Sequence, residues 1–134
     1  MVTGMTLTGP VQLFTVIALV SLPTVMFGGY SLLGLLRRRR LTEEQRAFFR
    51  AGHAHAGVLL VLALVALQLL GQGGLGEALR WVTCFLLLFG VLAQSGGLFL
   101  HLLPRKALAH RVTVSGAVLL GAAMLLTAWG VAVA

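Results

Sequence analysis

Four histidines and one glutamine are the residues of this chain best suited to chemistry in an apolar environment. His53 and His55 open a long apolar run, and His101 and His110 flank a short basic segment further along. Imidazoles can transfer protons near neutral pH or ligate a metal ion. Gln94 precedes His101 by seven residues, so both side chains fall on one side of a helix. The sequence therefore predicts a site formed by His55, Gln94 and His101.

The spacing of small residues predicts which histidine faces inward on the second apolar run. Small residues mark the protein-facing side of a membrane helix. One such stripe passes close to His55 and consists of Gly52, Ala56, Ala63 and Ala66. His53 is two residues earlier, about 200° away around the helix. We therefore expect His55 inside the bundle and His53 at its cytoplasmic rim.

Similar stripes predict the inward faces of the other helices. An unpaired amide in hydrocarbon costs several kcal/mol, so Gln94 should point into the bundle. Its stripe consists of Thr83, Leu87, Gly90, Gln94, Gly97 and His101. The stripe expected on the last helix consists of His110, Thr113, Ala117, Gly121, Met124 and Ala128. With Tyr30 from the first helix, these faces would surround the cytoplasmic half of the core.

Hydropathy predicts the helices that carry these residues. The chain has 134 residues, of which 59% are hydrophobic and 10% charged. Uncharged apolar runs of about 18 residues or more are typical of membrane spans. Four occur, at about 11–36, 54–70, 81–103 and 112–133. The predicted fold is all-α, a single integral membrane domain over 1–134 with four antiparallel helices in up-down-up-down order. A capping-box pattern at Thr42 and Gln45 starts the second helix near residue 43.

Charge predicts the orientation. Nine of the ten basic residues fall within 37–50 and 105–111, which four spans place at one side of the membrane. Cytoplasmic loops carry the excess of Lys and Arg. We therefore expect both basic loops in the cytoplasm, both termini outside, and residence in the plasma (inner) membrane. The net charge of +7 then indicates contact with the lipid bilayer rather than a nucleic-acid partner.

Three functions fit the histidine cluster. The imidazoles of His55, His101 and His110 could hold haem or a transition metal. They could instead be the acid and base for a small-molecule substrate, with no cofactor. The cluster could also serve packing in a non-catalytic scaffold.

Two short motifs carry a resemblance to a family. The third span contains Phe89-Gly90 and Ala93-Gln94, and the second opens with His53, His55 and Gly57. With the four-span layout, this pattern resembles the hydroxylaminobenzene mutases. That family often has an acidic residue beside the histidine, where this chain has Ala54 and Ala56.

The resemblance implies an isomerase, an intramolecular transferase without a redox cofactor. It would move the hydroxyl of an N-aryl hydroxylamine onto the ring, or rearrange a related compound. A histidinium would protonate the departing oxygen, and Gln94 would stabilise the electron-poor intermediate. Glycines outside the stripes also predict a homo-oligomer, because close helix contacts in membranes use such residues. They are Gly28, Gly29, Gly34, Gly96 and Gly116.

Overall fold

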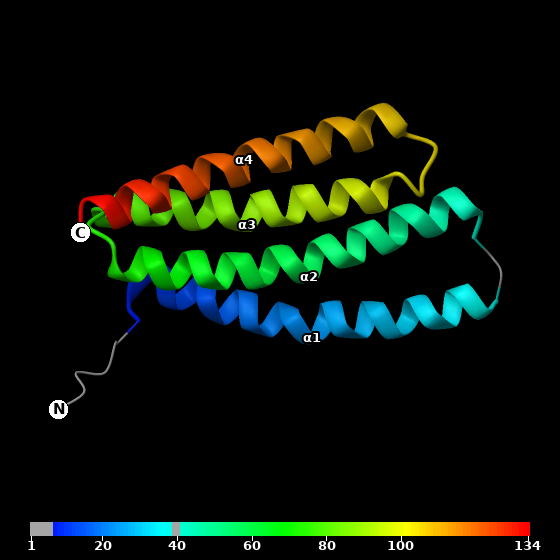
Figure 1. Cartoon of the computed structure of the whole chain (residues 1–134), viewed down its shortest axis with the longest axis horizontal. Helices are drawn as coiled ribbons and strands as arrows, with labels where there is room; N and C mark the ends of the chain where they lie inside the picture. The colour runs from blue at the N-terminus through cyan, green and yellow to red at the C-terminus, as the bar shows by residue number, and fades with distance from the viewer. Residues whose placement is uncertain (1–6, 39–40) are drawn as a thin grey trace.

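Four long helices make up the computed structural model, which describes residues 7–38 and 41–134. They are α1 (Gly9–Arg37), α2 (Glu43–Gln72), α3 (Glu77–Leu100) and α4 (Lys106–Ala132). Successive helices run antiparallel, and the described residues contain no strand (Figure 1). The predicted all-α four-helix fold is confirmed.

All four helices are long and apolar enough to cross a membrane. Large apolar side chains also cover the outside, as on Met26 and Leu125, which are 73% and 74% exposed. In water such a surface would be strongly unfavourable, whereas lipid accommodates it. The chain is therefore an integral membrane protein.

The two ends of the bundle differ in composition. The start of α1, the α2–α3 connection and the end of α4 lie at one end, which we call the glycine end (Figure 1). The α1–α2 and α3–α4 connections lie at the other, which we call the basic end. At the glycine end, Arg80 Nε and Nη2 donate to the carbonyls of Leu75 and Gly73, at 2.8 and 2.7 Å. The Gly74 amide donates to the Gly130 carbonyl at 2.8 Å.

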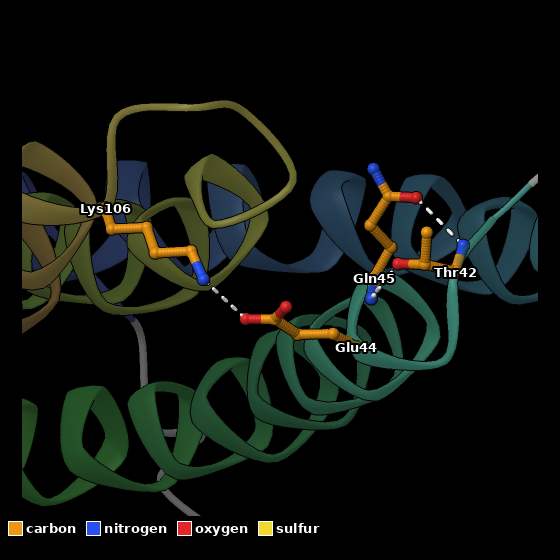
Figure 2. Close-up of polar contacts among 4 residues, drawn as sticks. All are labelled: Thr42, Glu44, Gln45 and Lys106. Carbon is orange, nitrogen blue, oxygen red and sulfur yellow. Dashed lines mark hydrogen bonds and ion pairs between the residues drawn. The ribbon is translucent and has the colours of Figure 1, made fainter.

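The basic end is held by polar contacts that are exposed. Thr42 caps α2: its hydroxyl accepts from the Gln45 amide at 3.2 Å, and its own amide donates to Gln45 Oε1 at 3.0 Å (Figure 2). The predicted capping box is confirmed. Lys106 Nζ lies 2.8 Å from Glu44 Oε1 and so joins α4 to α2 (Figure 2). This lysine lowers the pKa of the Glu44 carboxyl by its hydrogen bond and its charge.

The helices pack unevenly because glycines bring α3 and α4 together. A Cβ on Gly90 would lie 2.8 Å from Leu120 Cγ, and one on Gly116 would collide with the backbone of Gln94. The α3–α4 pair is therefore tightly interlocked. Between α1 and α3 the small side chains leave a void, described below.

The inward face of α4 differs from the prediction. Its buried residues are Ala109, Gly116, Leu120, Ala123, Thr127 and Gly130. Ala117, Gly121 and Ala128 of the predicted stripe are exposed, so the expectation was wrong for them, whereas Thr113 does pack against Gly97 of α3. The reason is the close fit of Gly116 to α3, which fixes the rotation of the helix. The stripe predicted for α3 is confirmed by burial of Thr83, Leu87, Gly90 and Gly97.

Candidate functional site

The two histidines of α2 face opposite ways from those predicted. His55 is exposed, with Nδ1 2.9 Å from the Ala51 carbonyl oxygen of its own helix. His53 is half-buried against α1, where a Cβ on Gly29 would lie 2.7 Å from its Nε2. The expectation of His55 inside and His53 at the rim was therefore wrong. Gly28 and Gly29 have no side chains and leave room on α1 for the larger ring.

His101 is the C-cap of α3, and its ring contacts both a backbone carbonyl and an aromatic side chain. Its Nδ1 lies 2.9 Å from the Gly97 carbonyl oxygen. Its ring stacks on Phe48 of α2, with ring centroids 4.3 Å apart and planes at 12°. A stacked aromatic pair of this kind stabilises the contact between α2 and α3 at the basic end.

Gln94 lies within the bundle, as expected, but beside α4 rather than beside the histidines. Its backbone packs against Gly116, and its Oε1 is buried with no hydrogen-bond partner among the described residues. His110 is exposed on the second turn of α4, and Tyr30 is 75% exposed on α1. The predicted convergence of His55, Gln94 and His101 on one cavity is not found.

The residues predicted to hold haem or a metal are His55, His101 and His110. Over residues 7–38 and 41–134, no three His, Cys, Asp or Glu side chains are close enough together to hold a metal ion. His55 is exposed on α2, His101 is stacked on Phe48, and His110 is exposed on α4. These three histidines therefore do not form a group of three ligands among the described residues.

The void in the bundle lies elsewhere, between α1, α2 and α3. We call it the α1–α3 cavity. It follows α1 from Phe14 to Val25, α2 from Ala56 to Leu67 and α3 from Cys84 to Phe99, and it is partly open at the surface. Its volume is about 360 Å³. Ligand pockets in proteins commonly start at about 300 Å³ and are mostly apolar, with a few polar groups.

Three hydroxyl-bearing residues line this cavity among otherwise apolar and small side chains. Ser21 and Thr24 lie on α1, and Ser95 lies on α3. The Ser21 hydroxyl donates to the Ile17 carbonyl at 2.8 Å. The Ser95 side chain is buried, at 7% exposure, and its hydroxyl has no partner among the described residues.

An aromatic contact between α1 and α3 shows that Thr24 and Ser95 lie at similar depth in the bundle. The ring of Phe14 on α1 packs edge to face on Phe85 of α3, with centroids 5.1 Å apart. Both helices run toward the basic end, and each rises about 1.5 Å per residue. Thr24 and Ser95 are each ten residues beyond this contact. They therefore lie at similar depth on opposite walls of the cavity.

Sequence reasoning missed the cavity, although part of its signal is present. Small side chains occur on all three walls, at Ala18 and Ser21, at Ala56 and Ala63, and at Ser95 and Gly96. Facing small residues either draw helices together or leave a gap. The sequence pattern does not distinguish these outcomes.

Comparison with known proteins adds no family to this description. The sequence matches no protein-family model, no curated protein and no solved structure.

Proposed function

We propose that this membrane protein binds an uncharged, lipophilic small molecule in the α1–α3 cavity. The observation that carries the proposal is the cavity itself, about 360 Å³ with an apolar lining. None of the described lining residues is charged. An ionic ligand would lose its hydration there without a compensating partner, which is costly. An uncharged molecule dissolved in the bilayer meets no such cost.

Packing supports a ligand in this space. Protein interiors are close-packed, and atoms lining a void lose dispersion contacts on that side. An engineered apolar cavity of about 150 Å³ already binds benzene. The α1–α3 cavity is more than twice that volume and could hold a molecule with two aromatic rings.

Charge supports one orientation in the membrane. The basic end carries Arg37, Arg38, Arg46, Arg50, Arg105, Lys106 and Arg111 among its described residues. Cytoplasmic segments near membrane helices carry such an excess. In this proposal the basic end is cytoplasmic, the glycine end is outside, and the chain resides in the plasma membrane. The ligand would enter from the bilayer, because the cavity is partly open within the membrane-spanning part of the bundle.

Rearrangement of an N-aryl hydroxylamine is a second candidate function, favoured by the size of the cavity. A substituted aromatic ring fits the volume, and Ser95 and Thr24 could hydrogen-bond its N–OH group. None of the described histidines lines the cavity. Acid–base chemistry by His55 or His101 would therefore need a different arrangement of α2 and α3.

The binding proposal is tested by filling the cavity. Gly96 lines it, and a Cβ there would meet nothing within 4 Å, so Gly96→Leu adds bulk without a backbone clash. We expect saturable binding of diphenylmethane to the protein in phosphatidylcholine nanodiscs, after subtraction of partition into empty nanodiscs. Gly96→Leu should remove most of this binding.

The control places the same substitution on the outside of the bundle. Gly121 on α4 is exposed, and a Cβ there also meets nothing within 4 Å. Gly121→Leu should bind diphenylmethane as the wild type does. Equal binding by wild type and Gly96→Leu would contradict the proposal. The same preparations, given phenylhydroxylamine and analysed for aminophenol by chromatography, test the isomerase candidate.

A further inference from the structure

Thr15 and Ser95 are the two buried helix hydroxyls without a partner among the described residues, and only Ser95 lines the cavity, whereas other helix hydroxyls have resolved bonds. Five of these donate to the carbonyl four residues earlier on their own helix: Ser21, Thr83, Thr113, Ser115 and Thr127. This local bond is the usual way for a hydroxyl to be satisfied within a membrane helix. Ser95 does not form it, although it is buried, as Thr127 and Thr83 are. Its hydroxyl oxygen is itself buried in the cavity wall, so a rotation about χ1 would bring it to a molecule in the cavity.

A hydroxyl buried without a partner is unfavourable, because its donor has lost water and gained nothing. A ligand that supplies an acceptor removes this cost. Thr24 lies at similar depth on the α1 wall, so two hydroxyl-bearing residues line the same level of the cavity. The rest of the described lining is nearly all apolar. The arrangement suits an apolar molecule with one acceptor at that level.

We propose that the cavity selects uncharged lipophilic molecules that carry a carbonyl or similar acceptor, and that Ser95 donates the hydrogen bond which selects them. This inference rests on the proposed binding function and adds the chemical class of the ligand. The oxygen of the ligand lies beside Ser95 and Thr24. Its apolar body extends along the wall between Phe14 and Leu88.

A matched pair of probes isolates the acceptor. Benzophenone and diphenylmethane share two phenyl rings and differ in the group that joins them, a carbonyl or a methylene. Each is titrated into wild-type protein in phosphatidylcholine nanodiscs and corrected for partition into empty nanodiscs. One net hydrogen bond makes benzophenone the tighter ligand by about 2- to 10-fold.

Ser95→Ala tests the assigned donor. The Ser95 hydroxyl makes no bond within the described chain, so its removal leaves the packing of α3 intact. The variant binds benzophenone as weakly as diphenylmethane, and its affinity for diphenylmethane equals that of the wild type. Ser115→Ala makes the same substitution at an exposed hydroxyl bonded to Arg111, and it keeps the wild-type preference.

The outcomes separate this inference from the function on which it rests. Equal affinity of the wild type for both probes overturns the inference and leaves the binding function standing. A preference that survives in Ser95→Ala overturns the role of Ser95. No saturable binding of either probe overturns both proposals.

Irradiation of bound benzophenone locates its carbonyl, because the excited ketone inserts into nearby C–H bonds. Labels found by mass spectrometry within 21–25 of α1 or 92–99 of α3 support the inference. A second apolar groove lies between α2 and α4, where Leu62, Val65 and Met124 are among its lining residues. Labels confined to that groove overturn the placement of the ligand in the α1–α3 cavity.

Discussion

His53 and His55 are neighbours in sequence with different surroundings. The His53 ring fills the space left by Gly28 and Gly29 on α1, whereas the His55 ring is exposed on the outside of α2. A ring packed between helices contributes contacts that are lost on truncation. An exposed ring that bonds only to its own helix contributes little to the stability of the fold.

This difference predicts effects of different size on the free energy of unfolding. We expect His53→Ala to lower the free energy of unfolding by about 1 kcal/mol or more, and His55→Ala to change it by less than about 0.5 kcal/mol. Equilibrium unfolding in mixed micelles, with increasing sodium dodecyl sulfate, measures both. A larger loss for His55→Ala would show that the exposed face of α2 is packed against something in the membrane.

Individual side-chain directions were only partly predictable from the sequence. Gln94 and the small residues of α3 follow one stripe, because a polar amide and several glycines mark a single side. The histidines of α2 have no such marker. His53 could be placed only once Gly28 and Gly29 of α1 were known to face it.

At the scale of the elements, most helix boundaries follow from local chemistry, but α4 begins at Lys106, six residues before its apolar run at 112–133. The apolar runs, the Thr42 capping box and the glycines of the α2–α3 connection give helices close to those observed. The rotation of α4 does not follow. Small residues occur on several faces of α4. Ala117, Gly121 and Ala128 lie on its exposed face, and Gly116 and Ala123 lie on its buried face. Complementarity to α3 selects between these faces.

The α3–α4 contact predicts that substitutions at two glycines of α4 differ in their effect on the free energy of unfolding. Gly116→Val places side-chain atoms into the backbone of Gln94, so we expect a loss of about 1–3 kcal/mol or more in the free energy of unfolding. Gly121→Val points into open space and should cost less than about 0.5 kcal/mol. The same unfolding assay compares them. Similar stabilities for both variants would contradict the packing of α3 on α4.

At the scale of the molecule, self-association remains a prediction, and the structure changes which glycines are available for it. Gly28 and Gly29 contact His53, and Gly116 contacts Gln94, all within one chain. Gly96 lines the α1–α3 cavity. Among the five glycines considered, Gly34 is exposed with open space around it. A contact between copies through the other four would compete with packing or with the proposed ligand.

The distribution of charge over the whole molecule gives the last prediction. The basic end carries seven described Arg and Lys residues, and only Lys106 among them is paired with a carboxylate. The glycine end carries Arg80, whose guanidinium is held by two loop carbonyls. Positive charge is therefore concentrated at the basic end, which favours retention of that end in the cytoplasm.

Cysteine labelling in intact cells tests this orientation. Gly76 at the glycine end and Ala107 at the basic end are both exposed, and Cys84 is buried and should not react. A membrane-impermeant maleimide should label Gly76→Cys in intact cells, and it should label Ala107→Cys only after the membrane is permeabilised. The reverse pattern would place the basic end outside. The arrangement of the helices would be unchanged, but Arg37, Arg50 and Arg105 would then face the exterior, contrary to the charge argument.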